Sequence, residues 1–100
     1  MPFVFSYGSL QRPEVQRRTY GRELEGHAEE LPNYELGRSG QHANVIFNGR
    51  VESRVAGTVF EITDAELAAT DRYEAGDDYE RIGVVLASGR SAWVYVARQT

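Results

Sequence analysis

The N-terminal segment Phe3–Leu10 constrains the fold most, because it joins a strand directly to a glycine-containing turn. Phe3–Ser6 is rich in aromatic and β-branched side chains, which predicts a buried strand. In Tyr7-Gly8-Ser9-Leu10, the glycine allows the backbone to turn sharply or to approach a ligand closely. Such a turn leaves backbone N–H groups free to point at an anion or a developing oxyanion. The segment therefore suits a small polar ligand, although most strand–turn–helix connections bind nothing.

Two short helices are expected among a larger number of strands. Pro13 and Gly21 mark the start and the end of the first helix, since proline favours the first turn and glycine the position after the last. Thr63 and Glu66 form a capping box that begins the second helix, which Gly76 ends. Period-two patterns and apolar runs predict the further strands 22–30, 34–36, 43–47, 55–62, 79–86 and 91–97.

The connections between these strands are predicted from their turn residues. Residues 37–42 have the composition of a loop, and Asn48-Gly49 is a strong hairpin-turn dipeptide. Leu31-Pro32-Asn33 is expected to end the preceding strand, since proline donates no hydrogen bond to a ladder. Gly57, inside the long strand 55–62, marks a bend or a place where another group packs closely on the backbone.

Six or seven short strands with two short helices predict an α+β fold with a compact, strongly curved or barrel-like mixed sheet. The 100 residues are enough for one domain, spanning 1–100, with one modest core. The chain shows no internal repeat, linker or low-complexity tract.

Charge and composition exclude several classes of function. The net charge of −4 argues against a protein that binds nucleic-acid backbones, which normally presents a basic face. The absence of cysteine excludes disulfides and thiolate catalysis. No apolar run approaches the roughly 20 residues needed to cross a bilayer, and the N-terminus lacks the basic and apolar regions of a signal peptide. We therefore expect a cytoplasmic protein that binds neither nucleic acid nor membrane.

A second polar stretch, Asp71–Arg81, contains the strongest candidate for proton transfer. Glu74 falls in the last turn of the second helix, where the helix dipole disfavours a negative charge. The neighbouring carboxylate of Asp71 and burial against Tyr73 or Tyr79 would also raise the pKa of Glu74. Arg72 or Arg81 would oppose this increase if either paired with Glu74, and the sequence alone does not decide which effect is larger. A glutamate with a raised pKa is suited to general acid–base catalysis near neutral pH. Asp71 itself is more simply explained by a structural pairing, for example with an arginine.

Several motifs, in order along the chain, resemble those of the γ-glutamylcyclotransferase-like (AIG2-like) family. Tyr7-Gly8-Ser9-Leu10 resembles the opening motif of the family, and Val55–Phe60 resembles its central strand. Asp71–Gly76 followed by Tyr79-Glu80-Arg81 is similar to its acidic signature, and Ala92–Val96 to its last strand. Each motif alone is weakly specific, whereas the ordered set spans nearly the whole chain.

The resemblance implies a compact mixed β-barrel and an enzyme that cyclises the glutamyl part of a γ-glutamyl amide. The products are 5-oxoproline and a free amine, and no metal or cofactor is required. By the same resemblance, Glu74 is the catalytic acid and base. Tyr7, Gly8, Ser9, Leu10 and Tyr79 are then the substrate-binding residues, and the partner is a small γ-glutamyl molecule.

Two departures from the family pattern concern the second helix. Thr70 stands where leucine is usual before the aspartate, which shortens an apolar contact and would loosen the placement of Glu74. Ala75 stands where glycine usually follows the glutamate directly, and the glycine, Gly76, comes one position later. The shape of the loop over the cavity is therefore not determined by the resemblance. Neither the leaving amine nor the oligomeric state follows from the sequence.

Two other functions stay open at this point. A non-catalytic module would keep the same cavity and bind a small molecule without turnover. A hydrolase would use Ser9 as nucleophile with His27 or His42 as base, but neither histidine lies in a recognisable motif and Ser9 lacks the setting of a nucleophile elbow.

Overall fold

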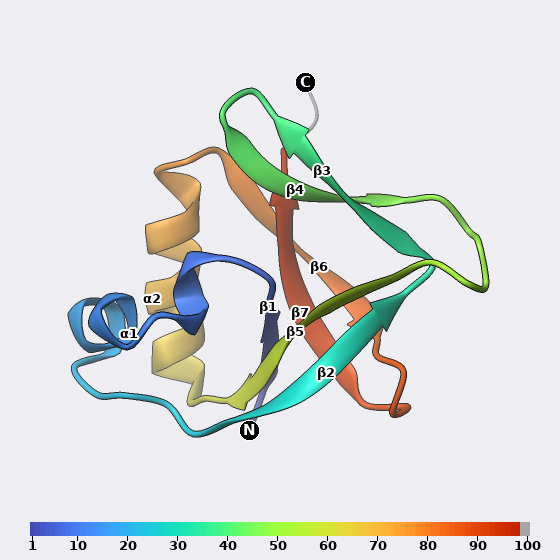
Figure 1. Ribbon diagram of the computed structural model, residues 1–100. Coiled ribbons are helices and arrows are strands. Elements are labelled where there is room, and N and C mark those ends of the chain that lie inside the picture. Colours follow the sequence, from blue (N-terminus) through green and yellow to red (C-terminus); the bar gives the residue numbers. More distant parts are fainter. Residues whose placement is uncertain (99–100) are drawn as a thin grey trace.

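A five-stranded sheet in the order β2-β5-β1-β7-β6 forms the centre of the computed structural model, which describes residues 1–98 (Figure 1). β1 (Phe3–Ser6) lies in the middle, as predicted for a buried strand. It pairs antiparallel with β5 (Arg54–Glu61) and parallel with β7 (Ser91–Ala97). The edge strands are β2 (Gly26–Pro32) and β6 (Tyr79–Val85).

A separate two-stranded sheet and three helical segments complete the fold. The hairpin consists of β3 (Tyr34–Ser39) and β4 (His42–Phe47). A 3₁₀ turn, η1 (Ser9–Gln11), follows β1 and leads into α1 (Pro13–Tyr20). α2 (Asp64–Ala75) connects β5 to β6, and both α-helices lie on the same side of the molecule (Figure 1). No helix within residues 1–98 is both long enough and apolar enough to span a membrane.

Both faces of β1 are buried, because different elements cover the two sides of the sheet. Val4 belongs to a core with Phe60, Ile62 and Tyr95, against which Leu67 of α2 packs. The next residue, Phe5, points to the opposite face of the sheet. There it packs in a second core, to which the hairpin contributes Val45. This second core consists of Phe5, Leu31, Val45, Val55, Val59, Leu86, Ala92 and Val94. The near-continuous apolar sequence of the strand therefore follows from its central position.

The sheet curls strongly but does not close into a complete barrel. The backbone N–H of Ala87, just after β6, donates to the carbonyl oxygen of Glu30 in β2 at 2.9 Å. Thus the two edges of the sheet approach each other at one end, while no ladder joins β2 to β6 in the described part of the chain. The predicted α+β fold with a strongly curved mixed sheet is confirmed, in the form of seven strands.

The helix boundaries agree with the predicted signals. Pro13 is the first residue of α1, and Gly21 ends it in the left-handed conformation at φ 75°. At the start of α2, the Thr63 hydroxyl accepts from the Glu66 N–H, and the Glu66 carboxylate accepts from the Thr63 N–H. Gly76 follows the last residue of α2 but keeps a right-handed φ of −61°.

The hairpin differs from the prediction in the position of its turn. Residues 37–42 are not a loop, since β3 and β4 extend until only Gly40 and Gln41 separate them. Asn48-Gly49 is not a hairpin turn either, because it belongs to the connection between β4 and β5, which lie in different sheets. The N–H groups of Asn48 and Gly49 both donate to the carbonyl oxygen of Asn33. Local turn chemistry identified the end of β4 at this dipeptide but not the strands that the connection joins.

The second strand begins and ends later than its alternating pattern predicted. β2 covers Gly26–Pro32, so Leu31 and Pro32 continue the strand and do not end it. Proline is tolerated here because β2 is an edge strand. The left-handed Asn33, at φ 71°, makes the turn into β3.

Gly57 marks a close backbone approach, as its place inside β5 suggested. A Cβ atom built there would collide with the carbonyl oxygen of Ser6 and would lie 2.6 Å from Cζ of Phe5. Hence β1 and the aromatic ring of Phe5 occupy the space that any side chain at position 57 would need.

We expect Gly57→Ala to destabilise the fold by about 1–3 kcal/mol, because a methyl group there forces β1 or Phe5 to move. Denaturant unfolding followed by circular dichroism measures the loss. Gly83→Ala in β6 is the matched control, since its Cβ would meet Trp93 at an ordinary 3.8 Å. Equal stability of the two variants would show that β1 yields easily at this contact.

Candidate active site

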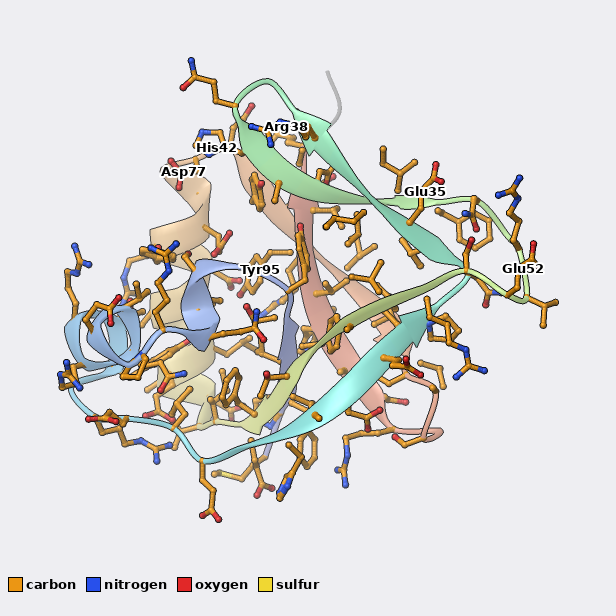
Figure 2. The ribbon with its side chains drawn as sticks, in the orientation of Figure 1. Glu35, Arg38, His42, Glu52, Asp77 and Tyr95 are labelled. Atoms are coloured by element: carbon orange, nitrogen blue, oxygen red, sulfur yellow. The ribbon has the colours of Figure 1, made fainter. Side chains whose placement is uncertain are left out.

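A cavity of about 220 Å³ opens where the turn after β1, the C-terminal end of α2 and the tip of the β3–β4 hairpin meet. Figure 2 shows His42 and Asp77 at this end of the molecule, with Tyr95 further inside. All six residues predicted for the site, Tyr7, Gly8, Ser9, Leu10, Glu74 and Tyr79, line the cavity. The other lining residues are Phe5, Ser6, Gln41, His42, Ala43, Asp77 and Tyr95.

The turn after β1 presents two backbone amides without partners. The Gly8 N–H donates to the Ser6 hydroxyl at 3.2 Å. The Ser9 and Leu10 N–H groups have no acceptor among residues 1–98, because the hydrogen bonds of η1 begin with the N–H of Gln11. Unpaired amides beside a cavity are suited to an anionic oxygen.

Gly8 keeps the space beside these amides open. Its backbone angles, φ −139° and ψ −138°, are not left-handed, so a positive φ is not the reason for a glycine in this turn. A Cβ atom at this position would meet no atom within 4 Å. The expected role of the glycine therefore lies in access to the cavity.

Glu74 is a largely buried residue that lines the cavity, and its carboxyl has no hydrogen-bond partner within residues 1–98. Only 8% of the residue is exposed, and its carboxylate neither accepts a hydrogen bond nor forms an ion pair within residues 1–98. Burial, and secondarily the nearby carboxylate of Asp77, raises the pKa of Glu74 to about 7. The direction agrees with the prediction, but the neighbouring charge belongs to Asp77 and not to Asp71.

Asp71 has a structural partner on each side. Its carboxylate accepts from the Tyr95 hydroxyl at 2.6 Å and pairs with Arg81 at 3.3 Å. The Arg81 guanidinium in turn stacks over the Trp93 ring, 4.3 Å from its centroid. Asp71 thus ties α2 to β6 and β7, and it leaves Glu74 as the unpaired acid of this helix turn.

The tyrosines of the cavity donate their hydroxyl protons to backbone carbonyls. The Tyr7 hydroxyl donates to the carbonyl oxygen of Tyr95 at 2.7 Å, and the Tyr79 hydroxyl donates to that of Ala43. Burial raises the pKa of Tyr7 and that of Tyr79, so both side chains stay protonated. The Tyr79 ring also meets the His42 ring edge-on, with centroids 6.2 Å apart. These contacts join the hairpin to the rest of the cavity wall.

The arrangement of Ser9 does not resemble that of a hydrolytic triad. Its hydroxyl lies 2.9 Å from the Tyr73 hydroxyl, and no histidine within residues 1–98 bonds to it. His42 lines the cavity, whereas His27 lies on the edge strand β2 and does not. Within the same residues, no three His, Asp or Glu side chains are grouped as they would be in a metal site.

Thr70 is anchored by hydrogen bonds and does not loosen the helix. The side chain is fully buried, donates to the carbonyl oxygen of Glu66 at 2.8 Å and lies 2.7 Å from the Tyr20 hydroxyl. Since Tyr20 ends α1, this pair fixes α1 to α2 one turn before Glu74. A polar anchor here replaces the apolar contact that leucine would provide.

Seven cavity residues were not among the predicted substrate-binding and catalytic residues: Phe5, Ser6, Gln41, His42, Ala43, Asp77 and Tyr95. Asp77 lies within the second polar stretch, so its proximity to Glu74 was available as a signal. Gln41 and His42 reach the cavity only because the hairpin folds over it, and no local pattern indicates that contact.

Comparison with known proteins identifies the family. The family model described as "Gamma-glutamyl cyclotransferase, AIG2-like" matches residues 4–100. Among curated proteins, none matches the sequence significantly.

Solved structures share the fold. A protein from Arabidopsis thaliana is 26% identical with a TM-score of 0.81, over 96% of this chain and 61% of its own. The Escherichia coli protein ytfP is 28% identical with a TM-score of 0.67, over 98% of this chain and 84% of its own. A structure titled "Gamma-glutamyl cyclotransferase" is 16% identical with a TM-score of 0.71, over 98% and 67% of the two chains. The present chain thus spans about three fifths of the Arabidopsis protein. By its sequence match and its fold, the chain belongs to the γ-glutamyl cyclotransferase, AIG2-like family.

Proposed function

We propose that this protein cleaves γ-glutamyl amides by cyclising their glutamyl part, which releases 5-oxoproline and a free amine. The observation that carries the proposal is Glu74, a buried and unpaired carboxyl that lines a cavity together with free turn amides. Family membership supports the same reaction class. The cavity volume of about 220 Å³ suits a glutamyl group whose leaving amine extends toward solvent.

The substrate supplies its own nucleophile in this reaction. The nitrogen of its α-amine attacks the γ-carbonyl carbon, a new C–N bond closes the five-membered ring, and the original amide C–N bond breaks. Because both groups belong to one molecule, the cavity needs only to hold it in a folded conformation, and proximity supplies much of the rate. Overall, the α-ammonium loses two protons and the leaving nitrogen gains two, so charge and atoms balance.

Glu74 carries protons between these two nitrogens. As a carboxylate it takes a proton from the α-ammonium, and as a carboxylic acid it returns a proton to the departing amine. A pKa of about 7 means that both forms are populated at neutral pH. The free N–H groups of Ser9 and Leu10, which also line the cavity, bind an anionic oxygen of the substrate.

We expect Glu74→Gln to reduce 5-oxoproline release by about 100-fold or more, since general acid–base catalysis contributes at least this much. The assay follows 5-oxoproline from a panel of γ-glutamyl amines, γ-glutamyl amino acids and glutathione. Glu80→Gln, an exposed glutamate on β6 outside the cavity, is the matched control and should keep wild-type turnover. Wild-type release by the Glu74 variant would contradict the mechanism, and binding without release by the wild type would favour a non-catalytic module.

Gly8→Val should lower kcat/KM on the order of 100-fold without unfolding the protein. The added Cβ atom meets no atom within 4 Å, while the branched side chain takes space beside the turn amides that the substrate would need. Gly83→Val on β6 controls for adding the same side chain elsewhere. Unchanged kinetics in Gly8→Val would mean that the turn serves only as a connection.

A further inference from the structure

We propose that the leaving amine preferred by this cavity carries a positive charge away from the scissile nitrogen and bears no carboxylate. This inference rests on the proposed function and specifies its substrate class. It follows from the charges at the mouth of the cavity, from the partners of those charges, and from the direction in which the leaving group must extend.

The cavity lining is acidic and contains no arginine or lysine. Its charged side chains are the carboxyls of Glu74 and Asp77, and His42 is the only basic residue that lines it within residues 1–98. The substrate's own α-carboxylate therefore relies on the turn amides of Ser9 and Leu10. A second carboxylate, as on the leaving group of a γ-glutamyl amino acid, would find no guanidinium on the cavity wall.

Asp77 differs from its neighbour Asp78 in a way that points to a ligand. The Asp78 carboxylate pairs with Arg98 at 3.4 Å and does not line the cavity. The Asp77 carboxylate lines the cavity and has no ion-pair partner within residues 1–98. Its charge acts on the buried carboxyl of Glu74, so the two carboxyls repel each other across this part of the wall. A cation placed between solvent and Glu74 would relieve that repulsion.

Asp77 belongs to the exposed rim of the cavity, where a leaving group would reach solvent. Glu74 is buried. The exposed lining residues include one glycine and three polar residues, namely Gly8, Gln41, His42 and Asp77. If the reacting centre lies beside Glu74 and the turn amides, a leaving group that extends between the hairpin tip and the residues after α2 passes Asp77. Asp77 is the only charged carboxylate on that exposed rim.

Arg38 is the arginine of the hairpin that could oppose this inference. Its guanidinium donates to the carbonyl oxygen of Gln41 at 3.1 Å, and it is not among the residues lining the cavity. Figure 2 shows Arg38 near the hairpin tip, at the same end of the molecule as His42. Because the Arg38 guanidinium already donates to the backbone, it is less available to bind a carboxylate on the leaving group. Substitution of Arg38 tests directly whether it binds one.

Three substrates of similar length test the inference: the γ-glutamyl amides of 1,4-diaminobutane, n-pentylamine and 4-aminobutyrate. Their leaving groups end in an ammonium, a methyl group and a carboxylate. We expect kcat/KM for 5-oxoproline release to fall in that order, by about fivefold at each step, as for an exposed ion pair. The differences should shrink in 0.5 M salt, because the charges at the mouth are accessible to screening ions.

Asp77→Asn should remove most of the advantage of the ammonium-bearing substrate over the neutral one. The comparison uses the ratio between substrates within one variant, so that any change in the pKa of Glu74 affects each substrate alike. Asp78→Asn is the matched control, since it removes a charge one residue away but outside the cavity, and it should keep the wild-type ratio.

The outcomes separate the two proposals. Release from all three substrates without the expected order, or with a ratio unchanged in Asp77→Asn, would overturn this inference and leave the proposed function standing. A preference for the carboxylate-bearing substrate that disappears in Arg38→Gln or His42→Gln would overturn it in favour of carboxylate recognition by the hairpin. Release from none of them, nor from the wider panel, would overturn the proposed function and this inference with it.

Discussion

The central position of β1 is the constraint on which the rest of the structure depends. Pairing with β5 on one side and β7 on the other fixes the strand, and the bare backbone of Gly57 allows Phe5 and Ser6 to pack closely. The turn that follows is therefore held at one place beside the sheet. α2 is held on the same side by two polar contacts, Asp71 with Tyr95 and Thr70 with Tyr20. Together these contacts bring the turn and Glu74 to the wall of one cavity.

Glu74 lowers the stability of the fold in which it is placed. Its carboxyl has an ordinary pKa of 4.5 when exposed and a pKa of about 7 when buried. Between these pH values only the unfolded chain ionises, so the folded state loses stability as pH rises, by on the order of 3 kcal/mol above pH 7. A single apolar residue at this position would avoid the loss. An acid with a raised pKa beside a cavity, at a cost in stability, supports the proposed role of Glu74 in proton transfer.

Much of the fold could be predicted from local signals. The apolar run Phe3–Ser6, the capping box at Thr63 and the Pro13–Gly21 pair each act over a few residues, and each appears where expected. The hairpin could not be placed in this way, because Asn48-Gly49 has strong turn chemistry while the true turn at Gly40 depends on which strands pair. For the same reason the sequence identified Glu74 and the first turn, but not the hairpin residues that close the cavity. The acid that acts on Glu74 is Asp77 and not Asp71. A structural pairing of Asp71 with an arginine was expected, but only tertiary contacts show that Arg81 and Tyr95 are its partners.

The most direct test is a pH titration of the Glu74 side-chain carboxyl by ¹³C NMR, with Glu74→Gln used to assign the signal. A midpoint near pH 7 is predicted, because the residue is 8% exposed and Asp77 adds a nearby negative charge. The midpoint should fall in Asp77→Asn, since one of the two causes is then removed. A midpoint near 4.5, the ordinary value for this group, would contradict the account, because Glu74 would then be a solvated carboxylate unable to return a proton at neutral pH.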